Sequence, residues 1–235
     1  MKITPKNSIV CDSCKNRIPA YDDTCPECGA FIRNRINNLN IWKTILNLFD
    51  SPVKTMTKII YSKRKSGIFL IAFAFVLTLA FYDFATFNFL RNESSGIGGF
   101  LKIFKTAIVN YTITILFVSL FVKFIFYPLG YKARFKDIAA VSIFAFVPII
   151  LTSFFLFPIE VGLFGEYWFT FHPYPWVIKS FPAYLLLSIH GIMLVWSLAL
   201  LFIGMKKIFK NNFISFAGFI LTAAAIFYGQ YIAVY

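Results

Sequence analysis

Charged residues are scarce in this sequence, and acidic residues are the scarcest of them. Of 235 residues, 14% are charged, and 10 Asp and Glu stand against 23 Lys and Arg. About a quarter of the residues are charged in a soluble domain, whereas here 59% are apolar and Phe alone occurs 31 times. With a mean hydropathy of +0.72, this composition excludes a disordered chain, a coiled coil and an ordinary cytosolic enzyme. It predicts an integral membrane protein with several spans.

Motifs for catalysis and for secretion are also missing. The sequence has no nucleophile elbow, no phosphate-binding loop and no His/Glu set at zinc-protease spacing, so we expect no enzyme. Residues 1–30 contain no apolar core run, and the first long run begins at Gly67, which is not the pattern of a signal peptide. We therefore expect the first span to insert the chain and the first 66 residues to stay on the side of synthesis.

Basic charge is abundant but is not arranged to bind nucleic acid. The net charge is +13, and residues 1–66 hold 12 Lys and Arg against 5 Asp and Glu. The remaining charges lie mostly in short loops between apolar runs, which is typical of signals that orient a membrane protein. No motif that reads nucleic acid accompanies them. We expect a bilayer with anionic headgroups, rather than nucleic acid, as their partner.

The four cysteines form the strongest local motif. Cys11, Cys14, Cys25 and Cys28 make two C-x2-C pairs separated by ten residues. Two such pairs can hold one tetrahedral zinc ion at about 2.3 Å from each sulfur, so we predict a four-cysteine zinc ribbon over residues 1–35 with one structural Zn²⁺. Two disulfides or a redox-active pair are the alternatives. A site closed by four sulfurs predicts no catalysis at the metal.

Residues 36–66 predict an amphipathic, basic linker. Apolar residues recur at helical spacing on both sides of Ser51-Pro52: Trp42, Ile45, Leu46 and Phe49, then Val53, Met56, Ile59 and Ile60. We expect one helix or a pair of helices on the inner membrane surface. There the basic cluster of Lys63, Arg64 and Lys65 would contact anionic headgroups. The alternative is that the apolar stripe packs on the protein's own loops.

Five apolar stretches in 67–235 have the length of a membrane span. They run at about 67–90, 104–127, 138–157, 183–204 and 213–234, and they predict an all-α membrane protein built as a five-helix bundle. Loop charges favour a cell-membrane protein with a cytoplasmic N-terminus, and five spans then place Tyr235 outside. Pro148 predicts a kink in the third span, because it removes one backbone bond. Whether the chain forms homo- or hetero-oligomers is left open.

Four polar side chains fall inside these stretches. A rise of 1.5 Å per residue places Asp83, Asn110, His190 and Gln230 in the outer third of the membrane. Polar groups in hydrocarbon are costly unless they meet each other or water, so we hypothesise a shared polar pocket that opens outward. The alternative is that each side chain reaches the interface or a backbone carbonyl alone. The aromatic outer loop at about 158–182 predicts an interfacial belt or, alternatively, a lipid-contacting or re-entrant segment.

Several further segments of the chain form a recognisable set. They are Ser51-Pro52, the stretch 131–138 that leads into Phe146-Val147-Pro148, the stretch 195–200, and Gly204-Met205-Lys206-Lys207. Together they resemble the Yip domain family of Ypt/Rab-interacting proteins. The resemblance covers about residues 40–235. It implies a five-helix membrane domain with a cytoplasmic N-terminus, binding of small GTPases in eukaryotic relatives, and no catalytic residues. The cysteine pattern and the residue usage resemble those of prokaryotic members, which often carry an N-terminal zinc ribbon.

Three functions fit these observations. The first is a non-enzymatic membrane organiser or adaptor, in which the zinc ribbon docks a cytoplasmic protein partner. The second is a transporter or lipid-translocating protein that uses the outward-facing pocket. The third is a zinc-dependent sensor that signals through the linker at Pro52.

Overall fold

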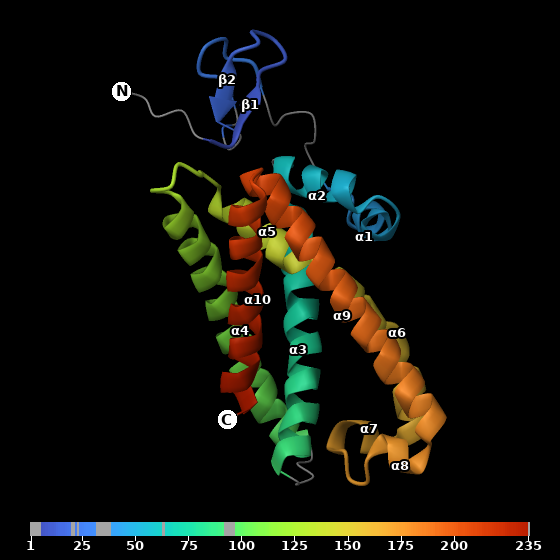
Figure 1. Cartoon of the computed structure of the whole chain (residues 1–235). Helices are drawn as coiled ribbons and strands as arrows, with labels where there is room; N and C mark the ends of the chain where they lie inside the picture. The colour runs from blue at the N-terminus through green and yellow to red at the C-terminus, as the bar shows by residue number, and fades with distance from the viewer. Residues whose placement is uncertain are drawn as a thin grey trace. The chain divides into compact units, whose positions relative to one another are not determined.

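The computed structural model describes residues 6–19, 22, 24–31, 39–62, 64–91 and 97–234. They form a small N-terminal hairpin followed by helices (Figure 1). The elements are β1 (Ser8–Val10), β2 (Arg17–Pro19), α1 (Ile41–Asp50), α2 (Pro52–Tyr61), α3 (Ile68–Arg91), α4 (Ile97–Phe126), α5 (Phe135–Phe144), α6 (Val147–Phe164), α7 (Tyr167–Thr170), α8 (Pro175–Ile178), α9 (Ser180–Phe209) and α10 (Asn212–Val234).

Five helical stretches in the described part of the chain are long and apolar enough to cross a membrane. They are Ile68–Leu90, Gly98–Phe126, Phe135–Phe164, Ser180–Phe209 and Asn212–Ile232. The predicted all-α membrane fold is therefore confirmed. The stretches begin or end up to seven residues from the predicted limits, because Gly98, Lys102, Pro158 and Glu160 lie inside helices. Membrane helices tolerate Gly and Pro, since neighbouring groups satisfy the backbone that these residues free.

The chain divides into two compact units, which we describe separately. The ribbon unit contains the described residues of 1–68 together with 116–145 and 199–223. The cavity unit contains the described residues of 69–115 together with 146–198 and 224–235. Helices α4, α9 and α10 each contribute one part to each unit, whereas α5 belongs to the ribbon unit and α6 to the cavity unit.

The third span is interrupted, and Pro148 lies just after the interruption. Helix α5 ends at Phe144, Ala145 and Phe146 form a turn, and α6 begins at Val147. Pro148 occupies the second position of α6, where a backbone N–H has no acceptor within its own helix in any case. The proline therefore accompanies a restarted helix and removes no interior bond. Pro158 is the proline inside α6.

Two short helices, α1 and α2, make up the linker, and a single residue joins them. The side chain of Asn40 caps α1 by accepting a hydrogen bond from the N–H of Lys43, at 3.1 Å. Ser51 ends α1 and precedes Pro52, the first residue of α2. Proline is favoured at that position because its φ already matches a helix. The predicted pair of helices is thus present, with Ser51-Pro52 at the bend (Figure 1).

Close helix contacts in the ribbon unit depend on small residues. A Cβ atom added at Gly204 of α9 would lie 2.3 Å from Cγ1 of Val141 in α5. On α10, a Cβ at Gly218 would lie 3.3 Å from the ring of Phe209, and Phe209 in turn meets Phe126 edge-on with ring centroids 5.0 Å apart. Glycines at such crossings let helix backbones approach closely.

In the cavity unit, two short helices connect α6 to α9. Helices α7 and α8 follow the end of α6, in orange in Figure 1. Phe164 and Trp168 pack with Ala183 and Leu186 in one buried cluster. The predicted outer loop at 158–182 is therefore mostly helical. The cluster fixes the end of α6 against the start of α9, and the candidate site is built between these two helices and α3.

Candidate functional site

The four cysteines converge on one point, as their spacing predicts. Their Sγ atoms all lie within 4.8 Å of one another. Cys11 and Cys28 are 3.7 Å apart, Cys14 and Cys25 are 3.6 Å apart, and all four are free thiols. Four sulfurs at about 2.3 Å from a tetrahedral zinc ion would stand roughly 3.8 Å apart. The geometry fits a four-cysteine metal site and contains neither of the two alternative disulfides.

Two equivalent backbone turns position these sulfurs. The N–H of Lys15 donates to the carbonyl of Cys11 at 3.0 Å, and the N–H of Gly29 donates to that of Cys25 at 2.9 Å. Both donors have positive φ, 61° at Lys15 and 68° at Gly29. Backbone N–H groups of Cys14 and Ser13 lower the pKa of the Cys11 thiol to about 6. This favours the thiolate that a metal requires.

The ribbon is seated on the ends of helices of its own unit through Asn7. The side-chain amide of Asn7, which is almost fully buried, donates to the carbonyls of Lys132 and of Ile208 at the end of α9. The N–H of Lys132 donates back to Oδ1 of Asn7 at 3.2 Å. Nζ of Lys210 donates to the carbonyl of Ser8 in β1 at 2.8 Å. Hydrogen bonds therefore hold the ribbon at Asn7, just before β1, and at Ser8, the first residue of β1.

The predicted basic cluster is not a uniform lipid-facing patch. Lys63 lies outside the described residues, and Arg64 is exposed. The side chain of Lys65 is only 9% exposed, and its Nζ lies 3.0 Å from Oδ1 of Asp137 in the first turn of α5. The same Nζ donates to the carbonyl of Ile59 at 2.6 Å. Lys65 thus ties the end of α2 to α5.

The apolar stripe of the linker divides into a packed part and an exposed part. Met56, Ile59 and Ile60 of α2 are buried, as the packing alternative predicts. On α1, by contrast, Trp42 is 76% exposed and Leu46 is 69% exposed. Phe49 and Val53 extend the same exposed set. Helix α1 therefore presents the apolar face that a membrane surface would accept.

Three of the four residues of the predicted polar pocket have side-chain hydrogen bonds in the structure, each to a different partner. Asp83, fully buried, accepts hydrogen bonds from the hydroxyl of Tyr111 at 2.8 and 2.9 Å. Asn110 donates to the backbone carbonyl of Gly229. This is the contact expected if each polar side chain bonds a backbone carbonyl alone. Gln230 is half-buried. Of the four, His190 alone lines the cavity described next, and a pocket shared by all four stays a prediction.

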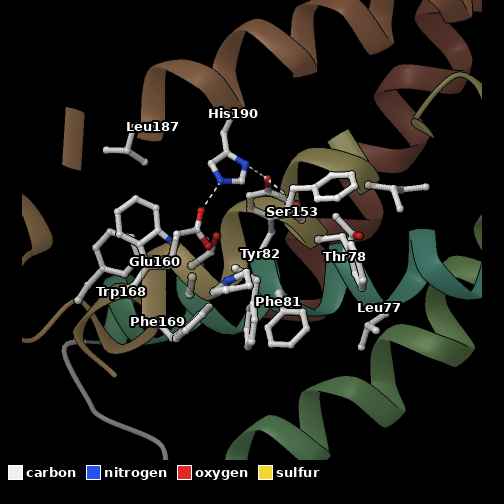
Figure 2. Close-up of a pocket in the computed structure, with 18 of the residues that line it drawn as sticks. Leu77, Thr78, Phe81, Tyr82, Ser153, Glu160, Trp168, Phe169, Leu187 and His190 are labelled. Carbon is white, nitrogen blue, oxygen red and sulfur yellow. Dashed lines mark hydrogen bonds and ion pairs between the residues drawn. The ribbon is translucent and has the colours of Figure 1, made fainter. Parts of the chain in front are cut away.

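A cavity of about 710 Å³ opens between α3, α6, α7 and α9 of the cavity unit. Its volume lies within the range of small-molecule sites, roughly 300–1,000 Å³. Aromatic side chains dominate the wall, among them Phe81, Trp168 and Phe169 (Figure 2). Phe81, Phe157 and Phe169 contact one another with ring centroids 5.5 to 5.9 Å apart. Trp168 and Trp176 come from the segment predicted as an interfacial belt. These rings face a cavity within the protein.

A polar network crosses one wall of this cavity. Nε2 of His190 lies 2.6 Å from Oε1 of Glu160, and its Nδ1 lies 2.6 Å from the hydroxyl of Tyr82. The Tyr82 hydroxyl also lies 3.2 Å from that of Ser153. Figure 2 shows the imidazole between the carboxylate and the phenol. When Glu160 is ionised, its carboxylate can only accept, so Nε2 of His190 donates to it, and in the neutral imidazole Nδ1 accepts from the Tyr82 hydroxyl.

Sequence reasoning missed Glu160, the acidic member of this network. The predicted third span ends at about 157, so Glu160 falls in the predicted outer loop at about 158–182. Two signals pointed the other way: the apolar run continues for four residues after Glu160, and Glu160 follows Ser153 by seven residues. A spacing of seven puts both side chains on one helix face, and both line the cavity.

No family model, curated protein or solved structure matches the chain. The class of protein therefore follows from the fold and the sites alone. The chain is a multi-pass, membrane-type helical protein with a candidate four-cysteine metal site near its N-terminus. The resemblance to the Yip domain family stays a prediction.

Proposed function

We propose that this chain is a non-enzymatic membrane protein that binds an amphiphilic molecule in the cavity and carries or translocates it. The observation that supports this function is a ligand-sized, aromatic cavity with one polar wall. Ligand sites are mostly apolar and have a few well-placed polar groups. Ionisable side chains within membrane helices are costly and mark functional sites. Glu160 and His190 meet that description, and they replace the four-residue pocket as the candidate site.

Tryptophan fluorescence tests this proposal, because Trp168 and Trp176 line the cavity. The chain, with Trp42 and Trp196 replaced by Phe, would be placed in lipid nanodiscs and titrated with a brominated single-chain amphiphile. We expect saturable quenching of the two cavity tryptophans. The variant Ala85→Phe places an additional ring in the cavity and should abolish the saturable component.

The matched control for that substitution is Ala224→Phe. Ala224 is exposed on α10 and does not line the cavity, so it makes the same chemical change elsewhere in the cavity unit. We expect this variant to keep the saturable quenching. Quenching that rises only in proportion to the bulk amphiphile, and equally in all three proteins, would overturn the binding function.

A second function, that of a membrane organiser or adaptor of the Yip type, is supported by the seating of the ribbon. Asn7 and Lys210 hold the ribbon to its unit, so a partner that binds the ribbon would be fixed to the membrane domain. In this function the N-terminus is cytoplasmic, as the charge distribution favours, and the exposed face of α1 rests on the inner leaflet. A stoichiometric protein partner that is lost in Cys25→Ser, while the helices stay folded, would support it.

A further inference from the structure

The cavity combines one acidic side chain with a wall of aromatic rings. Ten of the residues that line it are aromatic, and among these lining residues there is no Lys or Arg. Glu160 is the acidic residue of the set, and it is 4% exposed. Burying a carboxylate is costly unless a partner compensates its charge. The composition of the wall therefore places an electronegative site inside the cavity unit.

His190 orients this carboxylate without having to neutralise it. When the Tyr82 hydroxyl donates to Nδ1, the imidazole is neutral, and its N–H at Nε2 donates to Glu160 over 2.6 Å. The pair then keeps one negative charge. Ser153 completes the chain of hydrogen bonds by its contact with the Tyr82 hydroxyl. In that tautomer the network fixes the position of the carboxylate at the cavity wall and leaves its charge available to a ligand.

We propose that the cavity selects a hydrophobic cation, such as a quaternary ammonium, a phosphonium or a protonated amine with apolar substituents. This inference rests on the proposed binding function and names the chemical class of its ligand. Aromatic faces carry negative electrostatic potential and attract cations within about 6 Å of the ring centroid. A cation in the cavity would meet these faces and compensate the charge of Glu160, while its apolar groups would pack on the Phe and Trp side chains.

Probes that match in shape and differ in charge test this selection. Tetraphenylphosphonium and tetraphenylborate are nearly isosteric with opposite charges, and triphenylphosphine oxide is a neutral relative. Each would be titrated separately against the detergent-solubilised chain carrying Trp42→Phe and Trp196→Phe, with emission from Trp168 and Trp176 as the readout. We expect the phosphonium to bind at least tenfold more tightly than either of the other probes.

Two substitutions of Glu160 and one matched control assign the preference to its charge. Glu160→Gln should lower phosphonium affinity at least tenfold and leave the neutral probe within twofold, whereas Glu160→Asp keeps the charge and should keep the cation preference. Glu166→Gln is the control, because Glu166 is exposed, lies six residues away and does not line the cavity. It should bind all three probes as the parent does. Circular dichroism establishes that each variant is folded.

The possible failures are distinguishable. Binding of the borate or the neutral probe as tight as that of the phosphonium would overturn the cation selection and leave the cavity as a binding site. The same holds if Glu160→Gln is folded and binds the phosphonium unchanged. Absence of saturable quenching by all three probes, together with no effect of Ala85→Phe on amphiphile quenching, would overturn both the proposed function and this inference.

Discussion

The buried ion pair between Lys65 and Asp137 gives the sharpest prediction about stability. Replacing Asp137 by Asn leaves the Lys65 ammonium buried, with the carbonyls of Ile59 and Ile60 as hydrogen-bond acceptors but without this carboxylate. Breaking one side of a buried pair costs about 3–5 kcal/mol. One kcal/mol shifts the melting temperature of a chain of this size by about 2–4 °C. We therefore expect Asp137→Asn to melt at least ~6 °C lower.

A double-mutant cycle separates the pair from its surroundings. Lys65→Met should also destabilise the chain, though less than Asp137→Asn, because the carboxylate it leaves lies in the first turn of α5, where the helix dipole favours negative charge. The double variant should lose less than the sum of the two single losses, by about 1–3 kcal/mol. Thermal unfolding of the full chain in detergent, followed by circular dichroism, measures all four corners of the cycle.

The exposed neighbour Arg64 supplies the control for this cycle. Arg64→Met removes a basic charge of the same cluster at an exposed position, and it should stay within about 0.5 kcal/mol of the parent. Strictly additive losses for Lys65→Met and Asp137→Asn would refute the reasoning. A loss for Arg64→Met as large as that for Lys65→Met would also refute it. The loss would then follow from removing a basic charge anywhere in the cluster and not from the contact between Lys65 and Asp137.

Three further predictions concern the ribbon and the helix crossings. The purified chain should contain one zinc ion by elemental analysis, and Cys25→Ser should lose it while the helical circular dichroism is retained. Lys15→Gly should stabilise the metal-bound ribbon against chelators by about 1 kcal/mol, since Lys15 has positive φ, whereas Gly29→Ala should weaken it. Gly204→Ala should destabilise the bundle by about 1–3 kcal/mol in thermal unfolding, while Gly191→Ala, in open space, should not destabilise it.

The membrane spans and the metal site could be predicted because local patterns determine them. Apolar runs of about 20 residues predict helices irrespective of what surrounds them, and all five predicted spans correspond to helical stretches, the third of them divided between α5 and α6. Likewise, two C-x2-C turns each bring two sulfurs together within a few residues. The role of Lys15 as the counterpart of Gly29 was missed, because a Lys at positive φ gives no sequence signal, whereas a Gly at the matching position does.

The polar contacts inside the spans could not be predicted in the same way. Which side chains meet depends on how each helix is rotated about its axis, and the spans are apolar on all sides, so no stripe sets that rotation. Asp83 therefore meets Tyr111, a residue type usually assigned to membrane interfaces. His190 meets Glu160, which lies in the stretch predicted as the outer loop. The rise per residue in a helix predicts how deep each polar residue lies in the membrane, but it does not predict which side chain it contacts.

The seating of the ribbon by Asn7 has a consequence for biosynthesis. Asn7 and its acceptor Ile208 are separated by 201 positions in the chain. At about 5–20 residues per second, a ribosome takes roughly 10–40 s to make the residues between them. The loop that carries the four cysteines can close around a metal early in that interval, because its ligands span only residues 11–28. The first part of the chain to be made is thus among the last to reach its final position, and it waits for the end of α9.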